Sequence, residues 1–201
     1  MKKCQCIATV LVVLFLSGCN GRKERKEEPD SRTGELKVNP KPLPEVSIHE
    51  AALNGEMGQI AAHLGGGTDV NLKDLEGRTP LMYASYNGNV EVIRSLIEKD
   101  ADVNLRDLYG RSALMMASSG PYPVAVKYLL EHGADPNLVD KEEHFTALMY
   151  AAAEGQLDVV KLLLAYGADP DMKDTDGDSA LTFAGNNGYS EVVSLLKSIK
   201  K

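Results

Sequence analysis

Apolar residues recur at helical spacing along most of this chain, in segments separated by short polar turns. In the clearest segment, a broad apolar stripe is formed by Val90, Val92, Ile93, Leu96 and Ile97. The stripe follows the helical period of about 3.6 residues. This pattern predicts an amphipathic helix that buries its apolar face.

A shorter helix is predicted just before this one. Thr79 followed by Pro80 is a typical helix start, because threonine caps the first turn and the N–H that proline lacks would be unpaired there anyway. Asn87 and Gly88 end the helix with a residue that tolerates a positive φ. Neither helix can bury its apolar face alone, so the pair requires neighbours for stability.

The same helix pair recurs along the chain. Aligning residues 78–104, 111–137 and 145–171 brings the same residue types into register, with a single inserted residue near Glu143. The period of 33 residues is marked by Asn71, Asn104 and Asn137. An internal repeat of this length predicts a stacked array of helix pairs.

The unit resembles the ankyrin repeat, whose signature is a TPLHxA helix start, a glycine turn, a VVxLLL second helix and a GADVN exit; residues 78–104 match it best. The resemblance implies an all-α ankyrin-repeat solenoid of about five helix-turn-helix repeats with short β-hairpin loops, the first and last repeats serving as caps. This domain would cover residues 46–201, with approximate repeats at 46–74, 75–107, 108–140, 141–174 and 175–201.

In such a scaffold, binding is expected on the concave side, at the loop tips and the exposed face of each first helix. At one position of the repeat, stacking would align an apolar ladder of Tyr83, Met116, Tyr150 and Phe183, widened by Tyr86. The tips add Arg78, Leu108, Tyr109 and Arg111. Exposed apolar strips with aromatic and arginine residues are typical of partner surfaces. The other interpretation of the ladder is that its residues only pack between stacked helices.

Charge limits the kind of partner. The full chain has 22 Lys and Arg against 29 Asp and Glu, a formal net charge of −7. Residues 46–201 contain 13 Lys and Arg against 23 Asp and Glu, which gives a net charge of −10. Nucleic acid and anionic lipid are therefore unfavourable partners. We expect a monomer that binds a protein of unknown identity with basic features, and no nucleic acid.

The N-terminus has a different pattern. A basic start is followed by a largely apolar stretch of ten residues from Ile7 to Leu16. As a helix, such a stretch rises only about 15 Å, half of a hydrocarbon core of about 30 Å. A basic start, a short apolar stretch and small residues at its end are the parts of a secretory signal peptide.

The residues LSGC, which end at Cys19, resemble the lipobox of bacterial lipoproteins. That resemblance implies removal of residues 1–18 and attachment of a diacylglycerol to the Cys19 sulfur; the alternative is an ordinary signal peptide whose cleavage region contains a cysteine. Residues 19–45 would be the lipidated N-terminus and a disordered tether, because they are rich in charge and proline. We expect a lipid anchor in the bacterial cell membrane, on its periplasmic side or at the outer membrane, and no other contact with the membrane.

Motifs of enzymes are missing from the sequence. Serine-hydrolase motifs, HExxH and a phosphate loop with GKS or GKT are absent. The segment DTDGDS from Asp174 resembles the start of a calcium loop, but Ser179 stands where the loop requires glycine. We expect no enzyme activity, no cofactor and no metal site.

Two functional hypotheses follow. The first is a membrane-anchored ankyrin-repeat lipoprotein that serves as a non-catalytic protein–protein interaction module in the bacterial cell envelope. The second is a dedicated inhibitor, immunity or accessory protein of one exported enzyme or toxin. The first predicts several moderate partners or a structural complex, and the second predicts one tight partner whose activity changes on binding.

Overall fold

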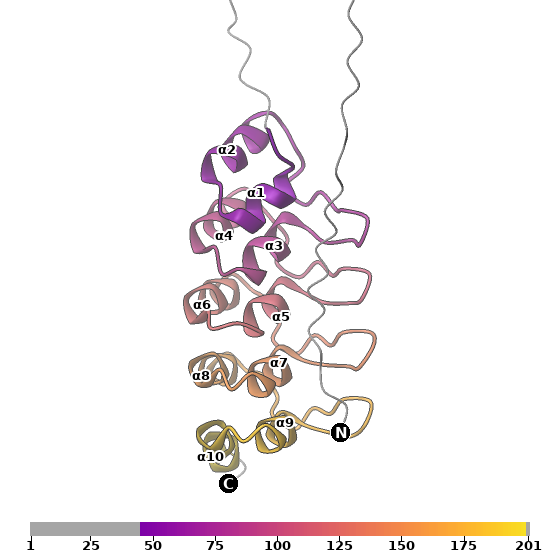
Figure 1. The fold of residues 1–201 in the computed structure, drawn as a ribbon, viewed down its shortest axis with the longest axis vertical. Helices are drawn as coiled ribbons and strands as arrows, with labels where there is room; N and C mark the ends of the chain where they lie inside the picture. Colours follow the sequence, from indigo (N-terminus) through magenta and orange to yellow (C-terminus); the bar gives the residue numbers. More distant parts are fainter. Residues whose placement is uncertain (1–44, 200–201) are drawn as a thin grey trace, which may run out of the picture. The chain divides into compact units, whose positions relative to one another are not determined.

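The computed structural model describes residues 45–199, which form ten α-helices arranged as consecutive pairs (Figure 1). The first helices of the pairs are α1 (Ile48–Asn54), α3 (Pro80–Tyr86), α5 (Ala113–Ser118), α7 (Ala147–Ala153) and α9 (Ala180–Asn186). The second helices are α2 (Met57–Gly65), α4 (Val90–Ile97), α6 (Pro123–Glu131), α8 (Leu157–Ala165) and α10 (Ser190–Ile199). The all-α solenoid expected from the sequence is confirmed for this part of the chain. The predicted signal peptide, Cys19 and almost all of the predicted tether lie outside the described residues.

The helices form two layers, one of first helices and one of second helices (Figure 1). Each first helix contributes a fully buried alanine: Ala51, Ala84, Ala117, Ala151 and Ala184. Small side chains at these positions allow the short helices of adjacent repeats to approach closely. The stripe predicted for the second helix of the second repeat is also buried, since Val92, Ile93 and Leu96 are each at most 1% exposed. The core therefore runs between the layers from one repeat to the next.

The first helices begin where the sequence predicts. The hydroxyls of Thr79, Ser112 and Thr146 accept hydrogen bonds from the backbone N–H three residues later. Pro80 occupies the first turn of α3. In the last repeat, Ser179 forms a reciprocal capping box with Thr182. These caps fix the start of each first helix and, with it, the position of the loop that precedes it.

The recurring asparagines join neighbouring repeats. Asn71 Oδ1 accepts a 2.9 Å hydrogen bond from Asp102 N–H, and Asn104 Oδ1 accepts one of 2.9 Å from Asp135 N–H. Asn137 continues the series through Asp169 N–H at 2.8 Å. The asparagines therefore recur with the repeat because each one accepts a hydrogen bond from the backbone of the next repeat.

The loops between repeats differ from the expected β-hairpins. They reverse direction and project beside the first helices (Figure 1), but residues 45–199 contain no β-strand. Each tip is closed by one backbone hydrogen bond, such as that from Asp107 N–H to Arg111 O, and a side-chain aspartate fixes its turn, as described below. In the same part of the chain, none of the helices combines the length and the apolar character needed to cross a bilayer.

Candidate protein-binding surface

The loops between repeats end in four tips, which we call tip 1 (residues 74–78), tip 2 (107–111), tip 3 (140–145) and tip 4 (174–178). Each tip is built around its first residue, an aspartate. In tip 2, Asp107 Oδ1 accepts hydrogen bonds of 3.0 Å from Tyr109 N–H and 2.8 Å from Arg111 N–H. Asp107 N–H in turn donates to Arg111 O at 3.0 Å. The aspartate thus satisfies the backbone of a tight turn.

The tips lie in a row because each is bonded to the one before it. Leu108 N–H donates to Glu76 O at 2.9 Å, which joins tip 2 to tip 1. Tips 2 and 3 are joined from Lys141 N–H to Tyr109 O at 2.8 Å, and tips 3 and 4 from Thr175 N–H to Glu143 O at 3.0 Å. Side chains at the tips are therefore held in fixed register from repeat to repeat.

The predicted apolar ladder lies at the base of these tips and is half-buried. Tyr83 donates its hydroxyl proton to Asp74 Oδ2 at 2.7 Å, and Tyr150 donates to Asp140 Oδ2 at 2.9 Å. Phe183 packs against Phe145, with ring centroids 4.8 Å apart. These contacts give the ladder a packing and bracing role. Its role in binding stays a prediction.

The hydrogen bonds also change the acidity of the groups that share them. Burial alone would raise the pKa of Asp74, but bonds from the Tyr83 hydroxyl and from the N–H groups of Arg78 and Glu76 outweigh it and lower the pKa below its ordinary value. Burial is the main cause that raises the pKa of Tyr150, and the negative charge of Asp140 raises it further. At the base of tip 1, a charged Asp74 beside a neutral Tyr83 is therefore the stable arrangement.

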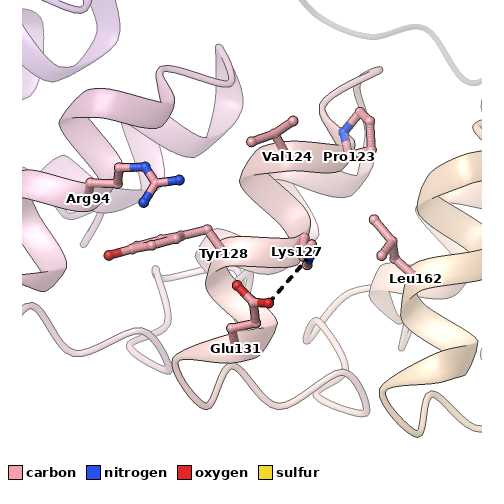
Figure 2. Close-up of a pocket in the computed structure, with 7 residues that line it drawn as sticks. All are labelled: Arg94, Pro123, Val124, Lys127, Tyr128, Glu131 and Leu162. Carbon is pink, nitrogen blue, oxygen red and sulfur yellow. Dashed lines mark ion pairs between the residues drawn. The ribbon is translucent and has the colours of Figure 1, made fainter.

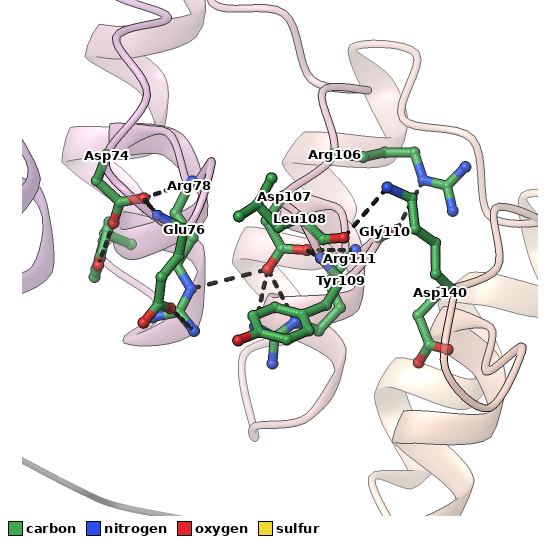
Figure 3. Close-up of polar contacts among 12 residues, drawn as sticks. Asp74, Glu76, Arg78, Arg106, Asp107, Leu108, Tyr109, Gly110, Arg111 and Asp140 are labelled. Atoms are coloured by element: carbon green, nitrogen blue, oxygen red, sulfur yellow. Dashed lines mark hydrogen bonds and ion pairs between the residues drawn. The ribbon is translucent and has the colours of Figure 1, made fainter.

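Tip 2 uses a different partner, because the ladder residue of its repeat is Met116, which has no hydroxyl. Arg111 replaces the tyrosine, with its Nε 2.9 Å and its terminal nitrogen 2.9 Å from Asp107 Oδ2 (Figure 3). Arg78 approaches the same oxygen at 3.8 Å and also pairs with Glu76. The Asp107 side chain is completely buried, so these arginines neutralise a charge that water cannot reach.

Exposed apolar side chains gather at the first two tips. Leu75 is 99% exposed, Leu108 62% and Tyr109 38%, and on α3 Tyr86 is 55% exposed. Arg111 lies over the Tyr109 ring, 4.7 Å from its centroid, and so limits the motion of that ring. We call Leu75, Leu108 and Tyr109 the tip patch; Tyr86 lies apart from it, at the C-terminal end of α3.

Charge is distributed unevenly over the four tips. Tips 3 and 4 are acidic at the surface, because Glu142, Glu143 and Asp176 are exposed. In the first two tips, however, Arg78 and Arg111 are paired with acids of the same two tips. Their patch is therefore apolar and close to neutral.

Sequence reasoning missed a shallow hollow of about 350 Å³ on the second helices, lined by residues of α4, α6 and α8 (Figure 2). Tyr128 lines it, with the Arg94 guanidinium 4.4 Å from the ring centroid. Lys127 pairs with Glu131 at 3.6 Å beside it. The available signal was a tyrosine where the preceding repeat has Ser95. Because the apolar pattern of this helix is typical of a buried helix, the sequence does not show that Tyr128 lines a hollow.

A family model described as "Ankyrin repeats (3 copies)" matches residues 48–140 and 125–201, well over half of the chain. The chain therefore belongs to the ankyrin-repeat family. Ankyrin repeats typically serve as protein–protein interaction modules, and the fold places the chain in that class of repeat protein. A comparison with curated proteins found no match.

Proposed function

We propose that this protein is a membrane-anchored lipoprotein whose ankyrin repeats bind another protein in the bacterial cell envelope, without catalysis of its own. The observation that carries the proposal is the tip patch, where large apolar side chains are exposed on two tips that are joined by a backbone hydrogen bond. One of its members, Tyr109, is a tyrosine. Tyrosine is among the residues that most often contribute strongly to protein–protein binding, and such clusters are uncommon on surfaces that bind nothing.

The rigidity of the tips supports the same proposal. Tyr109 is held by its neighbour Arg111, and Leu108 is fixed by its backbone bond to tip 1. A partner that binds preordered side chains loses less conformational entropy than one that must first order a loop. The tip patch is therefore suited to binding with little rearrangement.

The neighbouring tips define the chemistry of the partner. The patch on tips 1 and 2 fits apolar side chains, whereas the exposed acids Glu142, Glu143 and Asp176 on tips 3 and 4 favour basic ones. A protein surface with an apolar cluster beside a basic cluster matches both. A net charge of −10 over residues 46–201 opposes binding to nucleic acid.

The anchor is supported by the sequence alone. The residues LSGC place a cysteine where a lipoprotein signal peptide would be cut, and Cys19 would carry the lipid. Replacing Cys19 by alanine in the full chain tests this part. We expect labelling with radioactive palmitate to disappear and the protein to move from the membrane fraction to the soluble fraction. Labelling that survives the substitution would contradict the anchor.

The binding surface is tested by paired variants. The first is Leu108→Ser with Tyr109→Ser, which removes the centre of the tip patch. The matched control is Val124→Ser with Tyr166→Ser, because these residues are 57% and 40% exposed but lie on the side of the second helices. With the full chain immobilised in detergent, we expect the first variant to lose the envelope protein that the unsubstituted chain retains, and the control to keep it.

Equal retention by both variants would contradict the tip patch as the binding surface. The retained protein also separates the two functional hypotheses. An enzyme or toxin whose activity changes on binding would favour the dedicated inhibitor or accessory protein. Retention of several proteins with unchanged activity favours the general interaction module.

A further inference from the structure

Arg78 in tip 1 pairs with an aspartate of the next tip. Oδ1 of the aspartate in its own tip, Asp74, accepts hydrogen bonds from the backbone N–H groups of Glu76 and Arg78. Oδ2 of Asp74 accepts one of 2.7 Å from the Tyr83 hydroxyl. The Arg78 side chain pairs with the Glu76 carboxylate and, at 3.8 Å, with Asp107 Oδ2 in tip 2 (Figure 3). Arg78 therefore connects two neighbouring tips.

Asp107 can accept this second arginine because the ladder residue of its repeat, Met116, has no hydroxyl. In tips 1 and 3, a tyrosine hydroxyl donates to the equivalent oxygen of the aspartate. In tip 2 this oxygen lies 2.9 Å from Arg111 and 3.8 Å from Arg78 Nε, the latter an ion-pair distance and too long for a hydrogen bond. The Asp107 side chain is completely buried, so salt and water screen these contacts weakly. Among the ion pairs of residues 45–199, Arg78–Asp107 is the one that joins two tips.

Tips 1 and 2 are thus linked at two separate points. One link is the 2.9 Å backbone bond from Leu108 N–H to Glu76 O, and the other is the Arg78–Asp107 ion pair. Glu76 takes part in both, because its carbonyl accepts the backbone bond and its carboxylate pairs with Arg78. Two loops joined by a single hydrogen bond can pivot about it. A second link at a different point fixes their relative orientation.

The Leu108 side chain lies against tip 1 at this junction. Gly77 in tip 1 has a φ of 76°, and a Cβ added to it would lie 3.2 Å from Leu108 N and 3.4 Å from Leu108 Cγ. Leu75 belongs to the same turn of tip 1 and is 99% exposed. The orientation of tip 1 relative to tip 2 therefore decides where Leu75 stands relative to Leu108 and Tyr109.

We propose that Arg78 is a positioning residue of the tip patch, which joins tips 1 and 2 into one unit and so presents the patch as one surface. This inference rests on the proposed function, in which a partner binds the tip patch. The sequence predicts Arg78 as a residue that contacts the partner, whereas here it acts through the two tips. Its side chain is only 27% exposed. A partner that meets one preordered surface loses less conformational entropy than one that must align two separate loops.

Amide hydrogen exchange, measured by NMR on the full chain in detergent micelles, tests the junction without a partner. Leu108 N–H reports the bond between tips 1 and 2, and Lys141 N–H reports the equivalent bond between tips 2 and 3. In Arg78→Met, we expect Leu108 N–H to exchange about threefold to tenfold faster and Lys141 N–H to be unchanged. A general loss of stability would accelerate both. The control Arg94→Met removes an arginine that lies over Tyr128 on the second helices, and it should change neither rate.

A second variant and a binding measurement separate positioning from direct contact. Glu76→Gln keeps the Glu76 carbonyl but removes the carboxylate that pairs with Arg78, so it should also accelerate exchange of Leu108 N–H. Each full chain is then immobilised, and a detergent extract of the envelope is applied. We expect Arg78→Met and Glu76→Gln to retain less than about half of the envelope protein that the unsubstituted chain retains. Arg94→Met should retain all of it.

Equal acceleration of Leu108 and Lys141 in Arg78→Met, or acceleration of neither, would overturn the proposal. Loss of the retained protein with an unchanged Leu108 rate would overturn it too, because Arg78 would then contact the partner directly. Faster Leu108 exchange with full retention would contradict a positioning role. If the unsubstituted chain retains no protein, the proposed function fails, and the exchange rates alone decide whether Arg78 joins the tips.

Discussion

The hydroxyl of Tyr150 donates a 2.9 Å hydrogen bond to Asp140 Oδ2, and so connects α7 to the base of tip 3. Asp140 is only 4% exposed, so its charge relies on this bond and on its own backbone contacts. Tyr150→Phe keeps the ring but removes the donor. We expect the free energy of unfolding to fall by about 1.5–3 kcal/mol, as for a hydrogen bond to a charged group.

Urea unfolding of the full chain measures this effect. Tyr86→Phe is the matched control, since Tyr86 is 55% exposed and its hydroxyl makes no hydrogen bond to a described residue. Its effect should stay within about 0.5 kcal/mol. If Tyr150→Phe lowers the free energy of unfolding no more than Tyr86→Phe does, the Tyr150 hydroxyl does not stabilise the tip.

Tip 1 should make stability depend on pH in the acidic range. The pKa of Asp74 is lowered in the folded state, against an unfolded value of about 3.9. The charged form therefore stabilises the fold above about pH 4, and this contribution is lost as the pH falls through the lowered pKa. Tyr83→Phe removes the strongest hydrogen bond that lowers the pKa. We expect the stability difference between the unsubstituted chain and Tyr83→Phe to shrink as the pH falls below about 4. A difference that is constant from pH 6 to pH 3 would exclude the mechanism.

The Asp107–Arg111 ion pair should stabilise the fold more than an ordinary surface ion pair does. Asp107 is fully buried, and Arg111→Met would leave its carboxylate with two backbone donors and the more distant Arg78. We expect a loss of about 2 kcal/mol, less than for a fully buried pair because Arg111 is partly exposed. The control Lys127→Met breaks an exposed pair with Glu131 and should cost less than about 0.5 kcal/mol. Equal costs in thermal or urea unfolding would show that Asp107 does not need its arginine.

Replacing either of two serines in the core by alanine should stabilise the protein. Ser85 and Ser118 are fully buried, and their hydroxyls have no hydrogen-bond partner in the described part of the chain. The equivalent residues of other repeats are Ala52 and Ala152. Because an unsatisfied buried hydroxyl is costly and alanine favours helix, each substitution should raise the free energy of unfolding by about 1 kcal/mol. A loss of stability in either variant would reveal a partner for that hydroxyl.

The helices could be predicted from the sequence because each repeat contains its own capping residues and its own apolar periodicity. Thr79, Pro80 and the stripe around Ile93 lie close together in sequence, and local capping and periodicity act over the same range. Agreement between repeats then strengthened each local prediction. The boundaries of α3 and α4 follow directly from these residues.

The surface was harder to predict, because its contacts join residues that are adjacent only after folding. Tyr83 was expected to be available to a partner, but its hydroxyl is bonded to Asp74, nine residues earlier. Arg78 and Arg111 were expected at the partner surface, but both approach Asp107. Such pairings depend on the register of the tips, which periodicity does not reveal. The exposed Leu108 and Tyr109 were predicted as site residues, and their role in binding stays a prediction.

Site-specific photo-crosslinking in the intact envelope tests the central claim most directly. A photoreactive amino acid would replace Tyr109 in one strain and Tyr166 in another, since the two tyrosines are similarly exposed at 38% and 40%. We expect a discrete crosslinked protein from position 109 and none from position 166. Crosslinking from position 166 alone, or no crosslink from position 109, would contradict a partner bound at the tip patch.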